Sequence, residues 1–221
     1  MGTMNGTLPW YVARSAGLIA WALLTASVLW GLAMSTKARA FGKRPRPNWM
    51  LDLHRYLGGL AAIFTGVHVV AILLDTFVHF DLFSVLVPFA SQWRPTPVAW
   101  GIASLYLLLA VELTSLARRK LPKRLWRATH FASFPLFLSA TVHALTAGTD
   151  GGSWVFELVA TTAILAVAGL TALRISQAGQ APAVRPARVP VAPVATVPAA
   201  TVPALGEWPA PPRSRDTMTS P

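Results

Sequence analysis

The segment LHRYLGGLAAIFTGVH, residues 53–68, is almost wholly apolar, yet it carries a histidine near each end, at His54 and His68. The apolar run continues to Leu74, so it is long enough for a helix across a bilayer core, which takes about 20 residues. Ionisable side chains inside such a segment are costly and usually serve a function. The segment therefore predicts a membrane-spanning helix that carries a functional site.

The whole chain has the composition of a membrane protein. Of its 221 residues, 54% are hydrophobic and only 12% are charged, about half the charged share of a soluble domain. The formal net charge is nevertheless +11. Because the chain offers few polar faces, we expect a lipid bilayer and no nucleic acid as its partner. Cysteine is absent, which excludes disulfides, thiolate zinc sites, cysteine-ligated iron–sulfur clusters and a cysteine nucleophile.

Five segments have the length and apolarity of membrane spans. They cover residues 10–34, 53–74, 94–112 (or to 116), 128–147 and 154–173. We therefore predict an all-α fold: an integral membrane bundle of five transmembrane helices over residues 10–176, after a short extracytoplasmic N-terminus of residues 1–9. Residues 177–221 hold ten of the 18 prolines, and this Pro/Ala-rich composition predicts a disordered tail.

The basic residues predict the orientation of the spans. Twelve of the 19 lie at the first and third connections, against one at the second and none at the fourth. By the positive-inside rule the crowded connections are cytoplasmic, so the N-terminus is outside and the tail is cytoplasmic. Residues 80–92 then form an outer loop, and we expect a multi-pass protein of the inner or plasma membrane. The twelve are Lys37, Arg39, Lys43, Arg44, Arg46, Arg55, Arg118, Arg119, Lys120, Lys123, Arg124 and Arg127.

Four of the five histidines lie in the second and fourth predicted spans, which are parallel because both run from inside to outside. His54 and His130 lie near the cytoplasmic face, each within three residues of an arginine. His68 and His143 lie below the outer face, each seven residues before an aspartate. Depth therefore pairs His54 with His130, and His68 with His143. Along each helix the two depths are about 20 Å apart.

Two facing histidines without a third ligand suit the two axial positions of a haem iron, whereas zinc and copper sites take three or four clustered ligands. With both positions filled, electron transfer is favoured over oxygen binding. One difficulty is rotation: the 13 residues between His130 and His143 put them on different faces of an ideal helix, at about 3.6 residues per turn. Pro135 lies between them, and proline kinks helices, so we predict a kink there.

Two other interpretations stay open at this point. In the first, the histidines relay protons or bind metal ions in a transporter or channel, although the span centres hold few other polar side chains. In the second, the chain is a haem-free membrane anchor for a redox partner. The small residues beside the histidines have two explanations: they leave room for flat macrocycles, or they let helices approach closely.

At residues 53–68 and at WRATHFASFPLFLSATVHALTAGTD, residues 126–150, the chain resembles the ferric-reductase-like transmembrane domain superfamily. This group includes ferric reductases, NADPH oxidases and the haem-binding membrane subunit of the bacterial methionine sulfoxide reductase system. The resemblance covers roughly residues 10–175. It implies a helical bundle with two b-type haems that carries electrons outward from a cytoplasmic donor. On this chain, His54 and His130 would hold the inner haem, and His68 and His143 the outer.

The chain also departs from the family's pattern. Many members have six spans, and oxidases and eukaryotic reductases carry a fused flavin and nicotinamide domain where this chain has its tail. We therefore expect the membrane haem subunit of a transmembrane oxidoreductase, with no catalytic residue of its own. The donor would be a quinol, another protein or a flavin, either supplied by a partner or bound at the cytoplasmic face. The acceptor would be ferric iron, oxygen or an extracytoplasmic redox partner.

Three arginines are candidate partners of haem propionates, because arginine binds carboxylates bidentately. Arg14 would serve the outer haem, and Arg55 and Arg127 the inner haem. For all three, anchoring at the membrane surface is the alternative. The fifth histidine, His79, lies in the outer loop and is predicted to be a surface residue.

Overall fold

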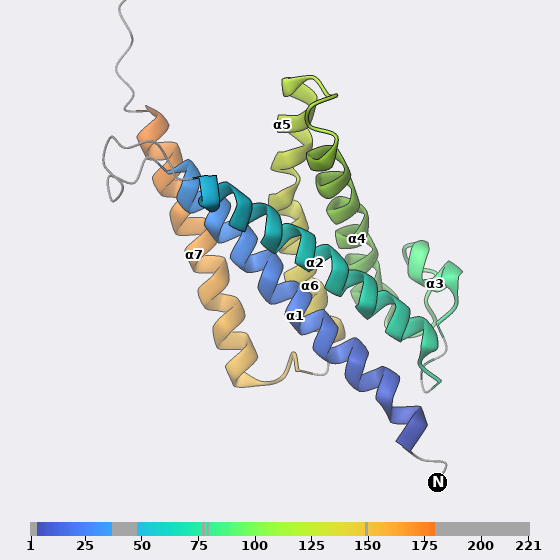
Figure 1. Cartoon of the computed structure of the whole chain (residues 1–221). Coiled ribbons are helices and arrows are strands. Elements are labelled where there is room, and N and C mark those ends of the chain that lie inside the picture. Colours follow the sequence, from blue (N-terminus) through green and yellow to red (C-terminus); the bar gives the residue numbers. More distant parts are fainter. Residues whose placement is uncertain (1–3, 37–47, 77, 79, 149, 180–221) are drawn as a thin grey trace, which may run out of the picture. The chain divides into compact units, whose positions relative to one another are not determined.

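The computed structural model describes residues 4–36, 48–76, 78, 80–148 and 150–179. All of them belong to one unit, Met1–Ala181, and the regular structure within them is helical (Figure 1). The basic residues between 37 and 47, His79 and the tail from residue 180 lie outside the described residues.

Four helices are long and apolar enough to cross a bilayer. These are α1 (Met4–Ser35), α2 (Asn48–Leu74), α4 (Pro95–Leu116) and α7 (Trp154–Gly179). They match the first, second, third and fifth predicted spans, and they confirm an all-helical, multi-pass membrane protein. The count of five spans and the orientation of the termini stay predictions.

The fourth predicted span, residues 128–147, is divided into α5 (Lys123–Phe131) and α6 (Ser133–Ala147) at Ala132. Pro135 accounts for the position of the break. Its nitrogen has no hydrogen to donate to the Phe131 carbonyl four residues earlier, and its ring crowds that carbonyl. The helix resumes where the Leu136 N–H donates to the Ala132 carbonyl, at 2.9 Å. The interruption predicted between His130 and His143 is therefore present, three residues before the proline.

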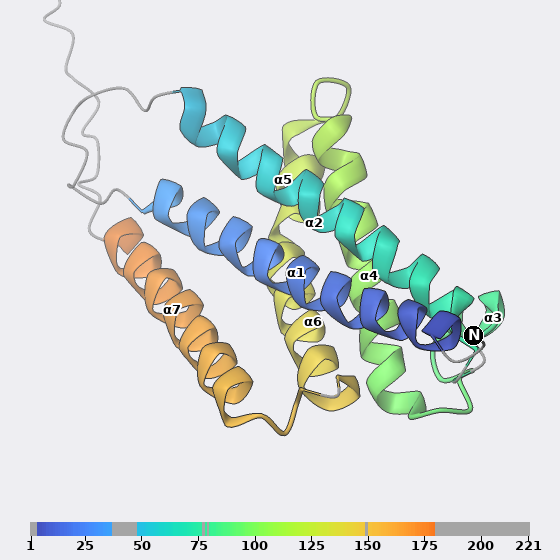
Figure 2. The ribbon, with the colours of Figure 1, turned by 60° about the horizontal axis from the view of Figure 1, so that its bottom comes forward.

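The helices pack as two close pairs, α1 with α2 and α4 with α6, and α7 lies against α1 (Figures 1 and 2). Helix α6 also contacts α1, and there the buried Trp21 indole donates to the Thr141 hydroxyl at 3.1 Å. By contrast, α2 and α6 are not closely packed over their described lengths. The two helices that carry most of the histidines are thus each held by a different neighbour.

A buried apolar cluster joins α1, α4, α6 and α7, and α2 adds Ala61 to it. Its members include Trp21, Leu24, Val28, Leu108, Leu136, Phe137, Ala160, Ala163 and Val167. Small residues such as Ala160, 1% exposed, let helix backbones come close, which is how membrane helices associate. On the outside of the same helices large apolar side chains remain exposed, for example Leu113 and Leu165. Those surfaces suit contact with lipid.

The predicted outer loop, residues 80–92, contains one short helix, α3 (Leu82–Leu86). Asp81 caps it by accepting hydrogen bonds from the Ser84 backbone N–H, at 2.8 Å, and from the Ser84 hydroxyl. These hydrogen bonds lower the pKa of the Asp81 carboxyl. The Tyr106 hydroxyl, near the middle of α4, donates to the Leu86 carbonyl at 2.6 Å, so this hydrogen bond ties the end of α3 to α4.

Candidate functional site

The four histidines of the helices lie as two facing pairs. The ring centroids of His54 on α2 and His130 on α5 are 6.0 Å apart, with an interplanar angle of 81°. Those of His68 on α2 and His143 on α6 are 6.3 Å apart, with an angle of 78°. These are the pairs that matching depth predicts. Because α2 and α6 are not closely packed, the rings approach across the space between two helix pairs.

Three of the four imidazoles are oriented by main-chain carbonyls of a neighbouring helix. The Nδ1 atom of His54 lies 3.1 Å from the Ser27 carbonyl oxygen, that of His68 2.7 Å from Ala13, and that of His143 2.9 Å from Pro97. A carbonyl oxygen only accepts, so each Nδ1 must carry the proton and each Nε2 keeps its lone pair. No hydrogen bond reaches these Nε2 atoms from the described residues. Histidines that bind metals are held in this way.

A glycine makes each of these three contacts possible. An added Cβ at Gly17 would lie 2.8 Å from His68 Nδ1, one at Gly31 3.1 Å from His54 Cε1, and one at Gly101 2.7 Å from His143 Nδ1. In every case the accepting carbonyl belongs to the residue four positions before the glycine. We call this arrangement a glycine notch: an imidazole lies against the bare backbone and reaches the carbonyl one turn earlier.

The notches escaped the sequence analysis, although a signal exists. Gly17 and Gly31 are 14 residues apart, and so are His54 and His68. On two antiparallel helices that equal spacing brings each histidine opposite a glycine. The third notch, Gly101 opposite His143, gives no such signal. Within the described residues α4 carries one notch only, so no second glycine repeats the spacing of a histidine pair.

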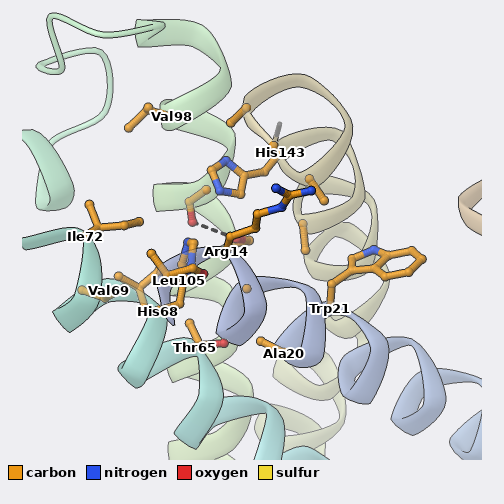
Figure 3. A pocket seen from close by; sticks show the side chains of 18 of the residues that line it. Arg14, Ala20, Trp21, Thr65, His68, Val69, Ile72, Val98, Leu105 and His143 are labelled. Atoms are coloured by element: carbon orange, nitrogen blue, oxygen red, sulfur yellow. Dashed lines mark hydrogen bonds between the residues drawn. The ribbon is translucent and has the colours of Figure 1, made fainter. Parts of the chain in front are cut away.

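His68 and His143, called the outer pair after their predicted depth, line a mainly apolar cavity of about 280 Å³ between α1, α2, α4 and α6. This lies close to the lower end of the range for small-molecule sites, about 300–1,000 Å³. His68 and His143 point toward each other in it, with Arg14 beside them (Figure 3). Thr65 and Leu105 belong to its walls. The apolar lining suits a largely apolar ligand.

Comparison with known proteins now identifies the family. A family model described as the ferric reductase like transmembrane component matches residues 16–141, more than half of the chain. The chain belongs to this ferric reductase-like family. The match begins in α1, includes His54, His68 and His130, and stops two residues before His143. No curated protein and no solved structure matches the chain.

Family membership indicates a role in membrane electron transfer. The described residues contain no cluster of three or more histidines, aspartates or glutamates able to hold a metal ion. Among the described residues, the four imidazoles therefore face one another in twos and in no larger group.

Of the three candidate arginines of this ferric reductase-like chain, Arg14 lies at the outer pair. Its guanidinium forms a fork with the Asp150 carboxylate, with Nε 2.7 Å from Oδ2 and Nη2 bonded to Oδ1, and it lies over the Trp10 ring. The carboxylate that Arg14 binds in this structure therefore comes from the turn after α6. That Arg14 binds a haem propionate stays a prediction.

The other two arginines lie on exposed surface, Arg55 on α2 and Arg127 on α5. Arg55 Nη1 is 3.4 Å from Asp52 Oδ1, with both side chains more than half exposed, and Arg127 is exposed on α5. Their predicted roles toward an inner haem also stay predictions. Glu112 on α4 is half-buried instead: an added Cβ at Gly58 of α2 would lie 2.7 Å from its Oε1.

Proposed function

We propose that the chain is the membrane subunit of a transmembrane oxidoreductase that binds two b-type haems. His54 and His130 would hold the inner iron, and His68 and His143 the outer. The spacing of the rings carries this proposal. Two imidazoles on opposite sides of one metal ion, with metal–nitrogen bonds of about 2 Å and each nitrogen about 1 Å from its ring centroid, have centroids about 6 Å apart. The observed separations are 6.0 and 6.3 Å.

The protein's own groups fit this ligand in two further ways. The carbonyl acceptors leave the Nε2 lone pairs of His54, His68 and His143 available for a metal and increase the basicity of these ligands. The mainly apolar wall of the outer cavity suits the flat apolar face of such a group, which His68 and His143 would hold from two sides. When bound, haem iron supplies one-electron transfer by changing between the ferrous and ferric states.

The proposed direction of transfer follows from the predicted topology. A donor on the cytoplasmic side (a quinol, a flavoprotein or a reduced flavin) would supply electrons at the His54–His130 level. An acceptor outside (ferric iron, oxygen or a partner protein) would take them at the His68–His143 level. Helices α5 and α6 would then together form the fourth of five spans, with an interruption at Ala132, in an inner or plasma membrane. Reporter fusions after residue 179 test this topology: activity of a reporter that works only outside the cytoplasm contradicts it.

The visible spectrum of the purified protein, oxidised and reduced, tests the function. We expect a Soret band and the sharp reduced bands of low-spin b-type haem. His68→Ala and His143→Ala should each remove the same haem, and His54→Ala and His130→Ala the other. His79→Ala, the fifth histidine, is the matched control and should keep both. If protein purified from cells that are supplied with haem shows no Soret band, the proposal is refuted.

A further inference from the structure

His130 differs from the other three paired histidines. Its Nδ1 atom is buried and has no hydrogen-bond partner, whereas the other three donate to main-chain carbonyls. None of the described glycines lies against its ring. A buried N–H without an acceptor is unfavourable, so something else must hold this imidazole in place.

The indole of Trp126 contacts the His130 ring. The two rings, one helical turn apart on α5, are stacked with centroids 5.2 Å apart and an angle of 20°. The Arg118 guanidinium lies 5.5 Å from the Trp126 ring centroid. The indole Nε1 is itself buried without a partner. What Trp126 offers His130 is therefore a flat face and no hydrogen bond.

We propose that Trp126 is the positioning residue for His130, and that it substitutes for a glycine notch at this one ligand. The proposal rests on the proposed function. A hydrogen bond from Nδ1–H to a carbonyl increases the basicity of a ligating imidazole, which stabilises ferric iron and lowers its reduction potential. The inner iron, with one ligand that lacks this bond, has a higher reduction potential than a fully hydrogen-bonded pair would give it.

The charges at the cytoplasmic end act in the same direction. Arg55, Arg118 and Arg127 place positive charge near the His54–His130 level, and positive charge favours the less positive ferrous state. A raised potential makes the inner site the easier one to reduce from a cytoplasmic donor. The reduction potential of the outer site also depends on the burial of its histidines. The test therefore compares the inner potential between variants, and not the inner potential with the outer one.

Optical redox titration of the full-length, haem-loaded protein tests the proposal through Trp126. Trp126→Gln places an amide carbonyl one turn from His130, and we expect the inner midpoint potential to shift downward. Trp126→Phe keeps the stacked face and loses no hydrogen bond, so the midpoint should stay unchanged. The outer midpoint is the internal reference, and it should stay constant in both variants. The midpoint potential that is missing from the titration of His54→Ala is assigned to the inner haem.

Three outcomes overturn the proposal: an unshifted inner midpoint in Trp126→Gln, an equal shift in Trp126→Phe, or an equal shift of both haems. Should Trp126→Gln lose the inner haem, ¹⁵N-histidine NMR of the reduced wild-type protein decides. We expect three strongly hydrogen-bonded Nδ1–H resonances and one, from His130, without that signature; four equal resonances refute the proposal. A protein without haem contradicts the proposed function instead, which separates the two failures.

Discussion

At the residue scale, three glycine notches determine which nitrogen each imidazole presents. At each notch, a missing side chain lets a histidine of one helix donate to a carbonyl of its neighbour. The proton is thereby held on Nδ1, and the lone pair stays on Nε2. The glycines matter for this close approach and not for any unusual backbone angle.

Replacing a notch glycine should release the histidine opposite. Gly17→Ala would put a methyl group 2.8 Å from His68 Nδ1, so the ring must move and the outer haem should be lost, with haem content falling from two per chain to one. Gly31→Ala should act on the inner haem in the same way. Haem-to-protein ratios from absorbance measure both effects.

Gly66 provides the matched control, because an added Cβ there meets nothing within 4 Å. Gly66→Ala should keep both haems and even favour the helix by about 1 kcal/mol. Retention of both haems in Gly17→Ala shows that the notch does not hold His68.

At the scale of elements, the break between α5 and α6 is what lets one span present two histidines to the same neighbour. His130 lies in the last turn of α5, and His143 lies in α6. On a continuous helix their rings would face different ways. Proline predicts that a kink exists. Its place, at Ala132, follows from the carbonyl that the proline leaves without a donor.

Pro135→Ala should join α5 and α6 into one helix and rotate His130 away from His54. We expect loss of the inner haem with the outer haem retained, and equal or greater helix content by circular dichroism. Pro95→Ala is the control, since Pro95 is the first residue of α4, where proline is well tolerated. If Pro135→Ala binds two haems, the break is not what aligns the histidines.

At the scale of the whole molecule, the bilayer made most of the fold predictable. A core of fixed thickness imposes the length and apolarity of its spans, and depth alone was enough to pair the histidines. Helix ends were less predictable: α2 begins at Asn48, beyond the apolar run, because helical hydrogen bonds continue into the polar interface. The notches and the Trp126 stack depend on how each helix is rotated against its neighbour, which depth does not determine.

The same scale explains why two stacked haems would suit the chain. Haems at the two proposed levels would let an electron cross most of the membrane in short steps. With the inside negative, outward transfer of one electron gains about 2.3 kcal/mol per 100 mV. The path depends on the pairing of His54 with His130 and of His68 with His143, since a different pairing would break it.

The haem content of two double variants measures that pairing. In His54→Ala/His130→Ala both changes fall on the inner pair, so we expect one haem per chain, with the outer spectrum unchanged. In His54→Ala/His143→Ala each pair loses one histidine, so we expect no low-spin haem. Equal haem content in the two double variants, or a haem retained only in the second, would refute the pairing.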